Sequence, residues 1–150
     1  MEERLMRILL IQGANTNLFG KREPALYGRT TAAEIDQMVQ AHAARRGVTL
    51  EIRYTNSEAE CIELIQRAFL DGWDGLLMNP GGFTRHARVI GETLKATGIP
   101  YVEVHMKNLE AHGGRSVLAE HAVGVVMGFR EHGYLYALDA LCDWLERKKE

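Results

Sequence analysis

The chain has 150 residues, 46% hydrophobic and 25% charged, a composition typical of one globular domain. Its net charge is -2, and basic residues form no run apart from 147–149, which argues against nucleic acid as a partner. The first apolar stretch, which ends at Gln12, is too short and wrongly flanked for a signal peptide or a membrane span, so we expect a cytoplasmic protein without a membrane partner.

Five short apolar segments alternate with segments of helical periodicity along the chain. The apolar segments are typical of buried parallel strands. Two of the helices begin with a capping-box pattern, at Thr31 and at Ser57, and the third is expected to place Val89, Ile90 and Leu94 on its inner face. The predicted strands cover residues 7–12, 48–54, 74–78, 101–105 and 122–127, the predicted helices about 31–47, 57–72, 85–97 and 133–147, and residues 106–120 form an irregular connection.

Strands that alternate with helices in this way form right-handed crossovers and a parallel sheet covered on both faces. We therefore predict one α/β domain over residues 1–150, with a flavodoxin-like, doubly wound, five-stranded sheet in the order 2-1-3-4-5. The ligand site of such a sheet lies beyond the carboxyl ends of its strands. Asn15, Asn79 and His105, with the loop 128–130, are expected to converge there, an arrangement that suits a polyoxygenated small molecule.

Several motifs then give a specific resemblance. The segment from Gly13 to Gly28, with its spacing Arg22-Glu-Pro-x-x-Tyr27-Gly28, resembles the active-site segment of type II 3-dehydroquinate dehydratases. Further motifs in the order of that family are Asn56-Ser-Glu58-Ala-Glu60, Asn79-Pro-Gly-Gly-Phe-Thr84, Val102-Glu103-Val-His105-x-x-Asn108 and Gly124-Val-Val-Met-Gly128 to Gly133-Tyr134-Leu135. The resemblance implies the elimination of water from 3-dehydroquinate to give 3-dehydroshikimate, through an enolate and without a metal or cofactor.

The resemblance assigns catalytic roles to five residues. Tyr27 would be the base, and Arg22 would stabilise its anion, which is needed because an ordinary tyrosine, with a pKa of about 10, is only roughly 0.1% ionised at neutral pH. Asn15 would hold a water or amide proton against the enolate oxygen, and His105 would be the general acid. Glu103 shares a strand face with His105 and would hold the imidazole in one tautomer.

The remaining candidate residues would bind the substrate. Asn79 would donate to the substrate carboxylate, and Gly81 and Gly82 would let the backbone approach it or would simply make a turn. This chain departs from the family pattern where Arg85 replaces a substrate-binding histidine and Lys107 replaces a carboxylate-binding serine, so we expect Arg85 to face the substrate. The acidic residue that reaches from a neighbouring subunit is represented by Glu92, in a dodecamer built of trimers. The candidate substrate-binding residues are Asn79, Gly81, Arg85, His86, Glu92, Met106, Lys107 and Arg115.

Other interpretations of the sequence remain. A divergent relative would dehydrate a similar cyclic 3-oxo polyol acid, and a silent homologue would serve assembly alone. A flavodoxin-like nucleotide module or phospho-receiver shares the strand order, but no acidic cluster or phosphate-binding glycine loop follows the first strand. Taken singly, Asn15 is most simply a turn residue and His105 a core histidine, and Cys61 and Cys142 show no metal or disulfide spacing.

Overall fold

A computed structural model describes residues 4–149 of the chain. Its strands are β1 (Arg7–Ala14), β2 (Thr49–Tyr54), β3 (Gly75–Gly81), β4 (Tyr101–His105) and β5 (Gly124–Met127). Its α-helices are α1 (Pro24–Tyr27), α2 (Ala32–Arg46), α3 (Glu58–Leu70), α4 (Arg88–Thr97) and α5 (His132–Lys148), with short 3-10 helices at Thr16–Leu18, Glu110–His112 and Ala119–His121. None of the helices in the described range is both long and apolar enough to cross a membrane.

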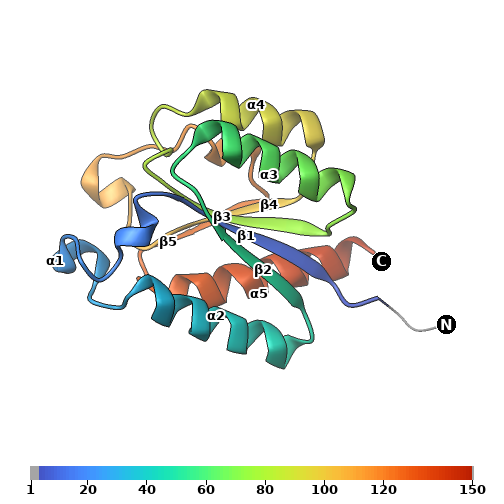
Figure 1. Cartoon of the computed structure of the whole chain (residues 1–150), viewed down its shortest axis with the longest axis horizontal. Coiled ribbons are helices and arrows are strands. Elements are labelled where there is room, and N and C mark those ends of the chain that lie inside the picture. Colours follow the sequence, from blue (N-terminus) through green and yellow to red (C-terminus); the bar gives the residue numbers. More distant parts are fainter. Residues whose placement is uncertain (1–3, 150) are drawn as a thin grey trace.

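The five strands form one parallel sheet in the order β2-β1-β3-β4-β5, which confirms the predicted topology. Helices α3 and α4 cover one face of the sheet, and α2 and α5 cover the other (Figure 1). Gln12 of β1 lies opposite Asn79 of β3, and Met78 lies opposite Glu103 of β4. This register brings the polar carboxyl ends of the three central strands to one edge of the sheet.

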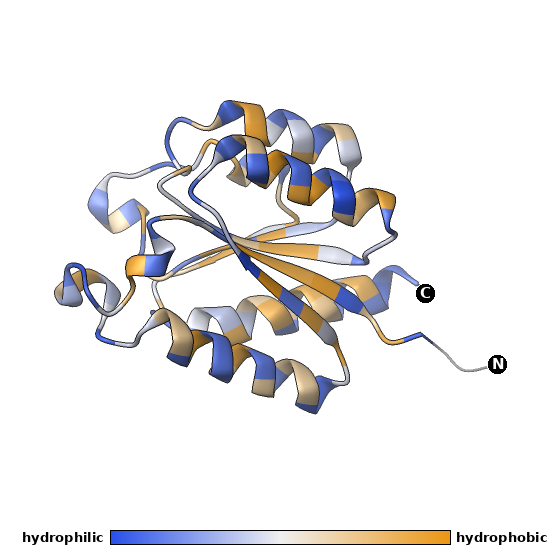
Figure 2. Cartoon of the chain, in the orientation of Figure 1, coloured by the Kyte–Doolittle hydropathy of each residue, from blue (hydrophilic) through white to orange (hydrophobic). Residues whose placement is uncertain are grey.

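Each face of the sheet has its own hydrophobic core, because successive strand side chains point to opposite sides. Ile8 and Leu10 pack towards α2 and α5, whereas Leu9 and Ile11 pack towards α3 and α4. The central strands are accordingly apolar along most of their length (Figure 2). The buried polar residues of these strands are Gln12, Asn79, Glu103 and His105, and they lie from the middle of each strand towards its carboxyl end, where the site is built.

The predicted and observed boundaries differ around β3 and α4. Strand β3 continues beyond Met78 to Gly81, because Gly82 N–H still donates to the Ala14 carbonyl of β1 at 2.7 Å. Helix α4 begins at Arg88, not at residue 85, since the preceding residues form a turn in which the Thr84 hydroxyl donates to the Gly81 carbonyl. The prediction that Val89 faces the core was wrong: its side chain is 49% exposed, whereas Ile90 and Leu94 are buried.

The two predicted capping boxes differ in completeness. The Thr31 hydroxyl accepts from the Glu34 N–H, and the Glu34 carboxylate accepts from the Thr31 N–H in return, so the box of α2 is complete. The Ser57 hydroxyl accepts from the Glu60 N–H, which is one half of the box at α3. Both helices nevertheless begin one residue after their cap, as the pattern predicts.

Helix α1 is a single turn in a segment for which the sequence predicts neither a strand nor a helix. Pro24 occupies its first position, where a missing N–H costs nothing, and Gly28 ends it with a φ of 78°. Glu23, just before it, has a φ of 33°, which is unusual for a residue with a side chain. This turn sets the position of Tyr27 relative to the sheet.

Candidate active site

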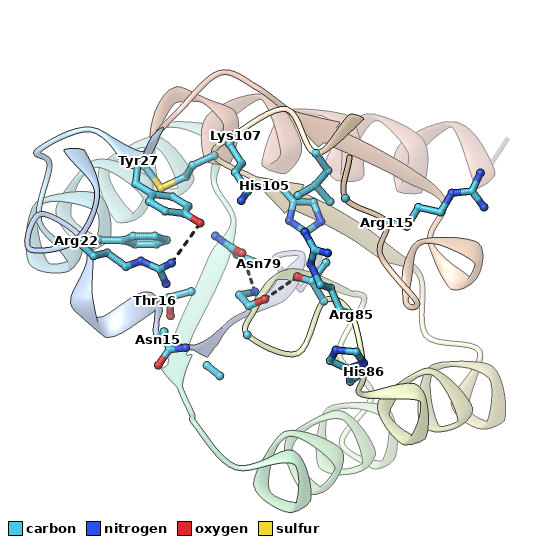
Figure 3. A pocket seen from close by; sticks show the side chains of 18 residues that line it. Asn15, Thr16, Arg22, Tyr27, Asn79, Arg85, His86, His105, Lys107 and Arg115 are labelled. Carbon is cyan, nitrogen blue, oxygen red and sulfur yellow. Dashed lines mark hydrogen bonds between the residues drawn. The ribbon is translucent and has the colours of Figure 1, made fainter. Parts of the chain in front are cut away.

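A cavity of about 280 Å³ lies beyond the carboxyl ends of β1, β3 and β4 and beside α1 (Figure 3). It forms where the strand order reverses between β1 and β3, which is where open α/β sheets bind ligands. The predicted loop 128–130 is not part of it; Arg130 lines a separate surface hollow beside Gly28. The candidate residues that line the cavity are Asn15, Arg22, Tyr27, Asn79, Gly81, Arg85, His86, His105, Met106, Lys107 and Arg115.

Two cations lie against the ring of Tyr27. Nη2 of Arg22 is 3.4 Å from the phenol oxygen, and its guanidinium carbon is 4.5 Å from the ring centre. Nζ of Lys107 is 5.6 Å from the same centre, so this residue faces the tyrosine as well as the cavity. Phe19 packs on the ring with centroids 6.1 Å apart. Two cations and an aromatic ring therefore surround the phenol of Tyr27.

A buried carboxylate holds the imidazole of His105. Nε2 of His105 is 2.7 Å from one oxygen of Glu103, and the hydroxyl of Tyr101 donates to the other oxygen at 2.6 Å. All three side chains are on the same face of β4, as alternating strand positions require, and Glu103 has no exposed surface. Glu103 therefore does not line the cavity; it contacts His105, whose Nδ1 is the ring nitrogen left for a ligand.

The burial of the Tyr101 side chain and its proximity to Glu103 raise the pKa of the Tyr101 phenol well above its usual value. Its proton is accordingly retained and is donated to the carboxylate. Sequence analysis did not identify this partner, although its position two residues before Glu103 puts it on the same face.

Asn15 has a left-handed backbone conformation at the end of β1, with a φ of 73°. Its backbone N–H donates to Oδ1 of Asn56 at 2.9 Å, which ties this turn to the loop after β2. A Cβ added to Gly82 would lie 3.1 Å from Nδ2 of Asn15, so the second glycine of the Asn-Pro-Gly-Gly motif leaves room for this amide. Asn15 is both a turn residue and a group that lines the cavity.

The substrate-binding candidates from the turn before α4 and from the 106–120 connection are arranged unevenly. Arg85 extends beside His105 in Figure 3, and its Nη2 would be 3.4 Å from a Cβ added to Gly114. The side chain of Arg115 points away from the other labelled groups. Glu92 is exposed on α4 and does not line the cavity within this chain. Arg85 and His86 both precede α4, and both line the cavity.

The charge of the cavity is strongly asymmetric. Arg22, Arg85, Lys107 and Arg115 line it, and within the described residues no carboxylate does. Such a lining favours an anionic ligand. No three His, Cys, Asp or Glu side chains in residues 4–149 are placed to share a metal ion. Gly82, expected beside Gly81, also lines the cavity, and the lining residues that were not proposed from the sequence are Ala14, Thr16, Phe19, Thr84, Leu109 and Gly114.

Comparisons with known proteins agree with the resemblance seen in the motifs. The family model "Dehydroquinase class II" matches residues 6–142. The 3-dehydroquinate dehydratases of Prochlorococcus marinus and Desulforudis audaxviator are each 40% identical to this chain over 147 residues, which cover 96% of it and 98% and 97% of those proteins. The crystal structure of the type II dehydroquinase from Butyrivibrio crossotus superposes with a TM-score of 0.89 at 30% identity, covering 92% of this chain and 98% of that one.

These matches extend over the sheet, the cavity and the motifs that line it, and they confirm the resemblance that the motifs predicted. They are incompatible with a nucleotide module or phospho-receiver. The chain belongs to the class II dehydroquinase family.

Proposed function

We propose that this chain catalyses the dehydration of 3-dehydroquinate to 3-dehydroshikimate. The observation that carries the proposal is the meeting, around one cavity, of a phenol beside two cations and an imidazole held by a buried carboxylate. The first pair is suited to accept a proton and the second to donate one, and an elimination of water needs both. The relatives that bear the name of this activity match over nearly their whole length.

The first step is the removal of a proton from the carbon next to the ketone. The oxygen of Tyr27 accepts that proton as the anion, which Arg22 stabilises by a charge-assisted hydrogen bond at 3.4 Å. The electron pair of the broken carbon–hydrogen bond moves into the ring and places negative charge on the ketone oxygen. Asn15 holds a proton against this oxygen, directly by its amide or through a water molecule.

The second step returns the electron pair and breaks the carbon–oxygen bond. His105 delivers a proton to the departing hydroxyl, which leaves as water, and a carbon–carbon double bond conjugated with the ketone forms. Glu103 keeps the imidazole in position by the 2.7 Å contact. The phenol proton is passed back to solvent or to the imidazole, so that both groups return to their starting state.

The substrate carboxylate meets donors at the other side of the cavity. Asn79 supplies an amide N–H, backbone N–H groups after His105 supply more, and Gly81 lets the main chain approach. Arg85 and the backbone at Met106 complete this side, and His86 lines the cavity from the turn before α4. No metal or cofactor takes part in the proposed reaction.

The direct test is a spectrophotometric assay with purified protein and 3-dehydroquinate. The product is an enone, so absorbance near its ultraviolet band rises if the reaction takes place. Tyr27→Phe keeps the ring but removes the proton acceptor, and kcat is expected to fall by at least about 100-fold, the lower range for general base catalysis. No absorbance change with wild-type protein, or turnover that survives Tyr27→Phe, would contradict the proposal.

A related substrate is the second candidate, and the observation that favours it is the pair Arg85 and Lys107. These cations are found where the family pattern has a histidine and a serine. The groups that bind the substrate therefore differ from that pattern, while the proposed base and acid, Tyr27 and His105, are kept. A panel of cyclic 3-oxo polyol acids compared by kcat/KM decides between the two. A higher value for any of them than for 3-dehydroquinate favours the second candidate, and no turnover of any leaves a silent homologue that serves assembly.

We also propose that the protein is cytoplasmic, acts in the shikimate pathway of aromatic amino acid biosynthesis, and assembles as a dodecamer of trimers. Glu92 supports the assembly, because it is exposed on α4 and has a role in the site only when it reaches a neighbouring subunit. Arg115, which lines the cavity, is assigned to the substrate as well. Size-exclusion chromatography with light scattering tests the dodecamer, which a monomer of 16.9 kDa would contradict.

A further inference from the structure

The Gly133-Tyr134-Leu135 motif has no role in the proposed reaction, yet Tyr134 is one of the largest fully buried side chains of the described chain. It lies on α5, and its hydroxyl reaches the sheet at the point where Gln12 of β1 and Asn79 of β3 are paired in register. Both of those side chains are also buried, at 0% and 4% exposure. A polar group in such a place is expected to have a defined partner.

The hydrogen bonds around Tyr134 run in one direction. Its hydroxyl donates its single proton to Oε1 of Gln12 at 2.8 Å, so towards Asn79 the oxygen can only accept. Nδ2 of Asn79 donates to it at 2.9 Å. On its other side Oδ1 of Asn79 accepts from the Gly81 N–H at 3.0 Å. Two partners of opposite polarity therefore fix the same orientation of the Asn79 amide.

An amide nitrogen has two hydrogens, and Tyr134 uses one of them. Because Asn79 lines the cavity, the other is available to a ligand there. Turning the amide over would place its nitrogen against Gly81 N–H and its oxygen against an oxygen whose proton is committed to Gln12. We propose that Tyr134 is a positioning residue that makes Asn79 present a donor, and so selects an anionic oxygen of the ligand over a donor group at this point.

Gln12 completes the arrangement, because it decides where the Tyr134 proton goes. Nε2 of Gln12 is the one buried side-chain nitrogen or oxygen without a partner among the described residues, so this amide is held by its oxygen alone. Burial raises the pKa of the Tyr134 phenol, and the group remains a neutral hydroxyl. The direction of the two hydrogen bonds, from Asn79 to Tyr134 and from Tyr134 to Gln12, is therefore the same at every pH used in an activity assay.

The inference rests on the proposed function, in which Asn79 meets the substrate carboxylate, and a mutant cycle tests it. Tyr134→Phe is expected to raise KM for 3-dehydroquinate about 3- to 10-fold, the size of one hydrogen bond, with kcat and its pH profile unchanged. In the Asn79→Ala background the same change should alter KM by less than about 1.5-fold. Equal factors in the two backgrounds would mean a general structural role and overturn the inference.

Two further variants control for folding. Tyr136→Phe removes a hydroxyl from the same helix at a position that is 49% exposed, and should leave KM unchanged. Gln12→Leu removes the acceptor of the Tyr134 proton and should raise KM, as Tyr134→Phe does. If Tyr134→Phe does not fold, Gln12→Leu takes its place in the test. An unchanged KM in Gln12→Leu then overturns the inference.

Two measurements separate this inference from the proposed function. Quinate keeps the carboxylate but has a hydroxyl in place of the ketone, so its dissociation constant can be measured by calorimetry without turnover. In Tyr134→Phe this dissociation constant should rise by about the same factor as KM. A wild-type protein that neither converts 3-dehydroquinate nor binds quinate refutes the substrate. A ligand-free crystal structure of Tyr134→Phe with the Asn79 amide unmoved refutes the positioning role whatever the substrate is.

Discussion

Glu103→Gln tests how much of the proposed chemistry depends on the buried carboxylate behind His105. The wild-type carboxylate accepts two hydrogen bonds, from Tyr101 at 2.6 Å and from His105 at 2.7 Å. Glutamine has almost the same shape but only one accepting oxygen. If the oxygen of the glutamine accepts from Tyr101, the NH2 group of the glutamine faces Nε2 of His105 and imposes the tautomer that carries its proton on Nδ1. If the oxygen accepts from His105 instead, the Tyr101 hydroxyl has no acceptor.

Either arrangement loses one hydrogen bond to a charged group, which is worth about 1.5–3 kcal/mol. If that loss falls on the transition state, kcat for 3-dehydroquinate drops roughly 10- to 150-fold, while KM changes little because Glu103 does not line the cavity. Enone absorbance gives kcat, and thermal unfolding shows that the variant is folded. Glu63→Gln, at an exposed position of α3, is the matched control. A kcat within 3-fold of wild type in a folded variant would refute the role of the carboxylate.

Three other results are expected. Gly13→Ala should lower the free energy of unfolding in urea by at least ~2 kcal/mol, because its Cβ would lie 2.1 Å from the Pro80 carbonyl oxygen and force β1 from β3; a near-neutral change contradicts this packing. The Cys61 thiol, whose pKa burial raises to about 12, should resist iodoacetamide at pH 8 until the protein is unfolded, and rapid labelling of native protein would show it to be accessible. Burial raises the pKa of Asp36, so its contribution to the free energy of unfolding is largest at acidic pH and is lost as the pH rises through the pKa of the folded state. Asp36→Asn, whose amide oxygen still accepts from Tyr54, should therefore raise the melting temperature at pH 7 but not at pH 3. An equal change at both pH values would show that the ionisation of Asp36 is not the cause.

The sheet could be predicted because its signals are local and repeated. Apolar strands, the Thr31 capping box and glycines at the helix ends each act within a few residues, and the strand order follows from the crossovers. The start of α4 was missed because the Asn-Pro-Gly-Gly motif continues β3 and then turns, which depends on a bond from Gly82 to β1. Helical periodicity does not contain that long-range contact.

The site was predictable where neighbours in sequence are neighbours in space. Glu103 and His105 share a strand face, so alternation predicts their contact, whereas the pairing of Arg22 with Tyr27 was expected from the family resemblance. The contact between Tyr134 and Asn79 spans 55 positions and exists only after α5 packs on the sheet. Lys107 was assigned to a carboxylate by its place in the motif, and its position over the Tyr27 ring required the packed structure.

The phenol and its guanidinium partner belong to one short segment between β1 and α2, whereas the imidazole and the Asn79 amide are fixed to strands. The base and its counter-ion are therefore supplied together, by a part of the chain separate from the part that supplies the acid. A substitution that changes the position of this segment would alter the distance from base to acid but would leave the base beside its counter-ion. In such a variant, an inhibitor that contacts only the groups on the strands would keep its affinity, whereas one that also contacts the phenol would lose affinity.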